Sequence, residues 1–65
     1  MKELDVVKLT CSYKGLQAGT LGTIVLKYDE SHFEVEFFDN DDETIGVYTT
    51  PLEVLASIND SERNV

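Results

Sequence analysis

The sequence has 65 residues, which is enough for one domain at most. It carries 5 Lys and Arg against 13 Asp and Glu, so its formal net charge is −8. This charge argues against nucleic-acid binding, which needs a surplus of cations, and favours a partner protein with a basic surface. One cysteine and one histidine cannot form an intramolecular disulfide or a multi-cysteine zinc site, so we expect no metal and no cofactor.

The hydropathy pattern bears on location. No apolar run approaches the roughly 18 residues that a membrane span needs. No basic segment precedes an apolar one, as it would in a signal peptide. We therefore expect a cytoplasmic protein with no membrane partner.

Short apolar runs separated by turn residues predict β-strands. We expect the first strand over residues 5–9 and a long, glycine-containing connection over 10–22. The second strand is expected over 23–28, where Ile24, Leu26 and Tyr28 alternate onto one face, and a hairpin turn over 29–32 follows.

The third strand has the clearest pattern. In residues 33–37 three apolar side chains alternate with Glu34 and Glu36, which is typical of a strand with one buried face. An acidic turn over 39–43 follows. The fourth strand is expected over 44–50, with Ile45 and Val47 facing inward and Pro51 ending it. Residues 52–55 predict a short 3₁₀ turn and a closing strand.

Four or five short strands would leave long exposed edges in a flat sheet, and curling into a small barrel removes most of that edge. We predict an all-β domain over residues 1–55 and a polar tail over 56–65, frayed or with one weak helical turn. Leu16 and Leu21 should cap the core from the long connection. The predicted core residues are Val7, Leu9, Ile24, Leu26, Val35, Phe37, Ile45, Val47, Leu52 and Leu55.

A family resemblance supports this fold. Gly19-Thr20-Leu21-Gly22-Thr23-Ile24-Val25 resembles the turn and strand of SH3-like and KOW-type barrels, and the stretch from Leu4 to Leu55 resembles the domain of unknown function DUF4926, a family of short bacterial proteins. The resemblance implies a five-stranded SH3-like barrel in a bacterial cytoplasm. It supplies no catalytic or ligand residues.

Four features could carry chemistry, and each has a plainer interpretation. Asp39, Asp41 and Glu43 alternate as at the start of a calcium loop, but the glycine and the final glutamate of that motif are missing, which favours a solvated turn. Glu34 and Glu36 would lie on one face of a strand, where exposed glutamates are ordinary. We therefore predict no catalytic residues.

The remaining two are His32 and Cys11. His32 follows Ser31 in a turn, with nothing that singles out the serine as a nucleophile. Cys11 has a single cationic neighbour, Lys14, and is expected to be a buried or half-buried small side chain rather than a reactive thiol. The tyrosines could line a peptide groove, but packing at the barrel ends is the simpler interpretation.

The last feature is the clustering of Asp and Glu residues in one part of the sequence. Six carboxylates fall within ten residues that contain no Lys or Arg, and Phe38 and Tyr48 fall out of phase with the predicted core. This pattern fits either a docking face, where charge steers the encounter and rings anchor it, or a solvated acidic side. The predicted partner-binding residues are Glu34, Glu36, Phe38, Asp39, Asp41, Asp42, Glu43 and Tyr48.

These observations favour a non-catalytic protein-binding module. A sharper hypothesis is an antitoxin- or immunity-type inhibitor that covers the basic surface of another bacterial protein, such as a nuclease. The alternative is an accessory regulatory module of a larger enzyme complex, docked through apolar residues and nearly insensitive to salt. The sequence leaves both open.

Overall fold

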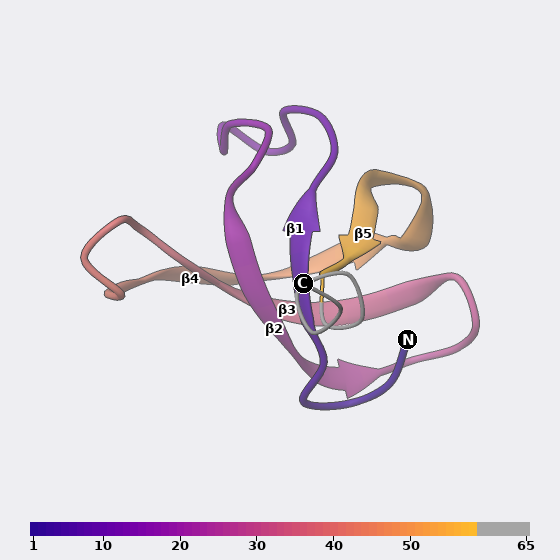
Figure 1. Cartoon of the computed structure of the whole chain (residues 1–65). Helices are drawn as coiled ribbons and strands as arrows, with labels where there is room; N and C mark the ends of the chain where they lie inside the picture. The colour runs from indigo at the N-terminus through magenta and orange to yellow at the C-terminus, as the bar shows by residue number, and fades with distance from the viewer. Residues whose placement is uncertain (59–65) are drawn as a thin grey trace.

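The computed structural model describes residues 1–58, and its regular secondary structure is β-strand apart from one short 3₁₀ turn (Figure 1). The strands are β1 (Val6–Leu9), β2 (Leu21–Lys27), β3 (His32–Phe38), β4 (Thr44–Pro51) and β5 (Leu55–Ser57). A single 3₁₀ turn, η1 (Leu52–Val54), links β4 to β5. Five strands in the predicted order confirm the all-β prediction.

The strands form one antiparallel sheet with the order β4-β3-β2-β1-β5. Strands β1 to β4 follow one another as a meander, and the chain then returns through η1 so that β5 pairs with the free side of β1. This arrangement fits the expected SH3-like domain. The sheet curls, so β2 crosses in front of β3 and β4 in Figure 1, and its two edges are β4 and β5.

The core lies against the concave side of the sheet. Phe33, Val35 and Phe37 are all fully buried, because they alternate along β3 with the solvent-facing glutamates. Phe33 was not among the predicted core residues and lies on the same face of β3 as Val35 and Phe37. The other buried side chains are Val7, Leu9, Leu16, Ile24, Thr50 and Leu55.

Gly22 allows the sheet to pack this closely. A Cβ atom at position 22 would lie 2.7 Å from the Val35 Cγ1 atom and 2.9 Å from the Glu36 carbonyl oxygen. Both distances are far below a normal contact of about 3.5–4.0 Å. Glycine is therefore required where β2 meets β3.

The prediction that Leu26 lies in the core is wrong, because β2 contains a bulge. Ile24 pairs with Val35 but Leu26 pairs with Glu34, so Val25 is the additional residue. The bulge shifts Leu26 to the solvent side of the sheet, where it is 42% exposed. Tyr28, expected on the same inner face, is exposed for the same reason.

A second bulge lies at the start of β4. Phe37 pairs with Gly46 while Phe38 pairs with Thr44, which leaves Ile45 as the additional residue. From Gly46 onward, β4 is therefore shifted by one residue relative to β3, compared with a hairpin without a bulge.

The shift inverts the predicted faces of β4. Tyr48 and Thr50 lie opposite Val35 and Phe33 on the core side, and Thr50 is fully buried. Ile45 and Val47, predicted to be in the core, are 43% and 47% exposed.

Three further predictions are corrected by exposure. Leu21 and Leu52 are exposed rather than buried, since Leu21 pairs with Phe38 on the solvent face and Leu52 begins η1 on the surface. Cys11 is exposed in the long loop and is not the half-buried side chain that was expected. Leu16 is buried from the loop, as predicted.

The domain boundary also moves. β5 extends to Ser57, so residues 56 and 57, assigned to the tail from the sequence, belong to the sheet through pairing with Lys8 and Val7. The prediction for the rest of the tail, residues 59–65, lies outside the described residues.

Candidate functional site

The candidate site begins with the side of β2, β3 and β4 that faces away from the core, which we call the outer sheet face. The registers place alternate residues of the three strands on it. Apolar and acidic side chains share this surface. Its members are Leu21, Thr23, Leu26, Glu34, Glu36, Phe38, Thr44, Val47 and Thr49.

Neighbouring hydroxyl groups fix the two glutamates of the outer sheet face. Glu34 Oε1 accepts hydrogen bonds from Thr49 Oγ1 at 2.8 Å and from the Tyr28 hydroxyl at 3.1 Å. Glu36 Oε2 accepts one from Thr44 Oγ1 at 2.6 Å. Hydroxyl donors orient a carboxylate without neutralising it, so both side chains present localised negative charge.

The acidic turn, residues 39–43, continues this surface beyond the ends of β3 and β4. Asp39 organises it, because its Oδ1 atom accepts the backbone N–H groups of Asp41 at 2.8 Å and Glu43 at 3.0 Å. Asp42 adopts a left-handed conformation with φ of 64°. Asp41, Asp42 and Glu43 are all exposed.

None of these carboxylates forms an ion pair within residues 1–58. The ion pairs found there join Lys2 to Asp5, Lys27 to Glu30 and His32 to Asp29, all away from the outer sheet face and the acidic turn. The surface formed by the outer sheet face and the acidic turn therefore carries six carboxylates without an ion-pair partner among the described residues: Glu34, Glu36, Asp39, Asp41, Asp42 and Glu43.

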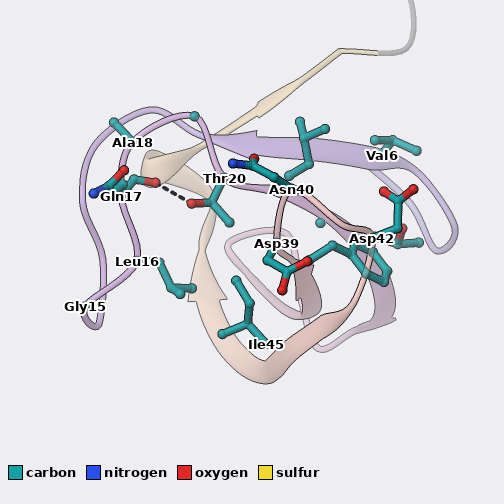
Figure 2. A pocket seen from close by; sticks show the side chains of 15 residues that line it. Val6, Gly15, Leu16, Gln17, Ala18, Thr20, Asp39, Asn40, Asp42 and Ile45 are labelled. Carbon is teal, nitrogen blue, oxygen red and sulfur yellow. Dashed lines mark hydrogen bonds between the residues drawn. The ribbon is translucent and has the colours of Figure 1, made fainter.

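An open groove of about 710 Å³ lies between the long loop, residues 10–20, and the acidic turn (Figure 2). One wall is formed by the loop from Gly15 to Thr20, which a hydrogen bond from Thr20 Oγ1 to the Gln17 carbonyl closes at 2.7 Å. The other wall contains Asp39, Asn40 and Asp42. The groove also has apolar lining from Val6, Leu21, Phe38 and Ile45.

The structure brings seven of the eight predicted partner-binding residues to one surface. The exception is Tyr48, which lies on the core side of β4 because of the bulge at Ile45, with its ring centroid 6.2 Å from that of Phe37. Sequence reasoning missed Leu21 and Leu26 of β2 and Ile45 and Val47 of β4, all of which it placed inside. The uncharged, β-branched character of β4 gave no sign that Ile45 and Val47 face solvent.

The other candidates from the sequence remain separate from this surface. Asp29 Oδ1 accepts the backbone N–H groups of Ser31 and His32 and contacts His32 Nδ1 at 3.2 Å, which forms a turn rather than a nucleophile–base pair. The Ser31 N–H group is the main reason that the pKa of Asp29 is lowered. No group of three metal-ligating side chains occurs in the part of the chain that the structure describes.

Fold and surface together define a small all-β domain with an exposed face that combines apolar side chains with carboxylates that form no ion pair in the described part of the chain. Residues 3–57 match the domain of unknown function DUF4926, and the chain belongs to that family. No significant match to a curated protein or to a solved structure was found. Within residues 1–58 no helix has the length and hydropathy of a membrane span.

Proposed function

We propose that this protein is a non-catalytic binding module that covers a basic surface of another protein with its outer sheet face and acidic turn. The observation that carries the proposal is the group of six carboxylates that form no ion pair within residues 1–58, around half-exposed apolar side chains. Oppositely charged surfaces attract at long range and accelerate association, whereas apolar side chains supply the desolvated anchors.

Phe38 is the best-placed anchor. It is half-buried on the outer sheet face, pairs across the sheet with Leu21, and lines the groove beside the acidic turn. A partner that covers it removes a large ring from water while the surrounding carboxylates meet cationic side chains. Aromatic residues in such central positions contribute most of the energy of many interfaces.

The sharper form of the proposal is an inhibitor of the antitoxin or immunity type. Proteins that bind phosphate backbones have basic surfaces, and an acidic face of this size can occupy one. The exposed Leu21, Leu26, Ile45 and Val47 favour a second candidate, an accessory module docked mainly through apolar contacts. Salt distinguishes them, because screening weakens the first kind of complex far more than the second.

The test is affinity capture from the native host with two charge variants. One carries Glu36→Lys, Asp41→Lys and Asp42→Lys on the proposed surface. The control carries Glu3→Lys, Glu30→Lys and Glu53→Lys at exposed positions elsewhere. Each reversal adds two positive charges, so both variants have a net charge of −2 in place of −8.

We expect proteins captured by the parent chain to be retained by the control variant and lost with the surface variant. Association of a purified partner should become slower and less dependent on salt with the surface variant. Phe38→Ala should mainly accelerate dissociation. Equal capture and kinetics with all three variants would refute the proposal and leave the acidic surface as a solvated face.

A further inference from the structure

Strand β4 is an edge of the sheet with little of the usual protection. It is the longest strand, with eight residues, and none of Thr44–Pro51 carries a charge although 28% of the chain is charged. Soluble proteins normally protect such edges with charged residues, a central proline or a very short strand. The opposite edge is protected in this way, because β5 has three residues. Along β4 the protective features are the bulge at Ile45 and Pro51 at the end of the strand, and neither lies at Val47.

The hydrogen bonds establish which backbone groups of β4 face outward. Leu52 N–H donates to the Ser31 carbonyl at 2.7 Å, so residues 31 and 52 form a hydrogen-bonded pair. Hydrogen-bonded and non-hydrogen-bonded pairs alternate along an antiparallel ladder, so the next pair, His32–Pro51, is a non-hydrogen-bonded one. Thr49 and Val47 follow at intervals of two residues and share that orientation. Accordingly, the Thr49 carbonyl accepts the Tyr13 hydroxyl at 3.0 Å from outside the sheet.

The N–H and C=O groups of Val47 therefore point away from β3. The Tyr13 hydroxyl occupies the edge at Thr49, but no hydrogen bond from another part of residues 1–58 reaches the backbone of Val47. The side chain of Val47 is 47% exposed. An extended peptide thus finds a free donor and a free acceptor at the centre of the strand.

The two sides of this edge differ in character. On the outer side, Val47 lies directly opposite Glu36, and Thr49 lies opposite Glu34. On the other side, the Tyr48 ring folds over Gly46, since a Cβ atom at Gly46 would lie 3.0–3.1 Å from the ring and hydroxyl atoms. An added strand would meet carboxylates across one face and an aromatic ring on the other.

We propose that the β4 edge binds an extended segment of the basic partner as a sixth strand, with Lys or Arg on its outer side and apolar residues against Tyr48. Backbone hydrogen bonds to Val47 hold the segment, as in other cases of strand addition. The long stems of Lys and Arg lie over Val47 while their charged ends approach Glu36 and the acidic turn. This inference rests on the proposed function and specifies how the partner docks.

Charge selects this occupant over a second copy of the chain. Each copy carries −8, and a second β4 would bring an uncharged strand flanked by another acidic turn. It would add repulsion and no cation. A cationic strand instead supplies the counter-charges that no ion pair within residues 1–58 gives to Glu34, Glu36 and the acidic turn.

The experiment uses a synthetic eight-residue peptide that alternates lysine with valine, and a matched peptide that alternates glutamate with valine. Amide hydrogen exchange and NMR shifts of the full chain are the readouts. We expect the lysine peptide to shift and protect the Val47 amide, and the glutamate peptide to do neither. This measurement on the parent chain needs no variant to fold.

Variants then test the edge itself. Val47→Pro removes the outward N–H group at a position where an edge strand tolerates proline, and Val47→Lys places a like charge beside the cationic peptide. Each should weaken peptide binding roughly ten-fold or more, and Val47→Ala should have a smaller effect because it keeps the amide. Loss of affinity only in the surface charge variant, with Val47→Pro and Val47→Lys binding like the parent, would refute strand addition and leave the proposed function intact.

Two further outcomes would overturn the inference. Peptide-induced shifts confined to the outer side chains, without protection of the Val47 amide, would mean docking on the face alone. Sedimentation equilibrium that finds a dimer of the parent chain, dissociated by Val47→Pro, would mean that a second copy occupies the edge.

Discussion

The substitution Gly22→Ala tests the packing on which the sheet depends. The new methyl group would lie 2.7 Å from Val35 Cγ1, 2.9 Å from Phe37 Cδ1 and 2.9 Å from the Glu36 carbonyl oxygen. Val35 and Phe37 are fully buried, and the carbonyl belongs to the backbone of β3. None of these neighbours is the free end of a flexible side chain, so the strands must separate to admit the methyl group.

The cost follows from two opposing effects. Overpacking a core typically costs about 1–3 kcal/mol. Replacing glycine also stabilises by about 0.4–1 kcal/mol through the unfolded chain, because Gly22 does not need a positive φ. We expect a net loss of about 1–2 kcal/mol in the free energy of unfolding. In a domain of this size each kcal/mol lowers Tm by about 4–8 °C.

Urea titration and thermal unfolding would measure this loss, with Gly46→Ala as the matched control. The three atoms nearest to a Cβ atom at Gly46 belong to the ring end of Tyr48, at 3.0–3.1 Å, and that half-buried side chain can move. The control should therefore cost clearly less than Gly22→Ala. Equal stability of the Gly22→Ala variant and the parent, within about 0.5 kcal/mol, would refute the close approach of β2 and β3.

Three further predictions concern neighbouring features. Phe37→Ala should cost about 3–5 kcal/mol in denaturant titration because it empties the core, whereas Phe38→Ala, half-buried on the outer sheet face, should cost about 1 kcal/mol. The pKa of Asp29 is lowered, first because its carboxylate accepts the Ser31 N–H group, and the ionised carboxylate therefore stabilises the fold at pH values above the ordinary aspartate pKa of 3.8. That stabilisation is lost as pH falls through the lowered value, so the stability difference between the parent and Asp29→Ala should be larger at about pH 7 than at about pH 2. Fluorescence anisotropy at about 150 mM salt should detect no binding to duplex DNA or single-stranded RNA, and tight binding would contradict the charge argument.

Much of the fold was predictable because its signals are local. Asp and Asn at residues 39–43 form the turn that their side chains favour, with Asp39 bonded to two backbone N–H groups. In β3, glutamates alternate with apolar residues, so the pattern assigns each side chain to the correct face. The positions of Glu34 and Glu36 on the candidate site follow directly from that alternation.

The two bulges were not predicted, and they account for most of the wrong assignments. Leu26, Ile45 and Val47 are apolar residues in strands, and composition alone places such residues inside. A single additional residue, Val25 in β2 and Ile45 in β4, reverses the face of the residues beyond it. The same reversal places Tyr48 on the core side of β4, away from the surface to which it was assigned. The bulge in β2 has no glycine beside it, whereas Gly46 directly follows the additional residue of β4 and was the one local signal of a bulge there.

The exposed apolar residues have an energetic consequence for the proposed complex. A domain of this length buries only roughly 60% of its unfolded surface, so its stability is small. Complete burial of one Leu, Ile or Val side chain contributes about 1.5–3 kcal/mol, and Leu21, Leu26, Ile45 and Val47 each leave two fifths or more of that surface in water. A partner that covers the outer sheet face and the β4 edge recovers part of this contribution. Because such a partner binds the folded chain and not the unfolded one, we expect it to raise Tm in proportion to the logarithm of its concentration above Kd. Charge reversal on the acidic turn should reduce this stabilisation by weakening the complex, without itself exposing or burying any apolar side chain.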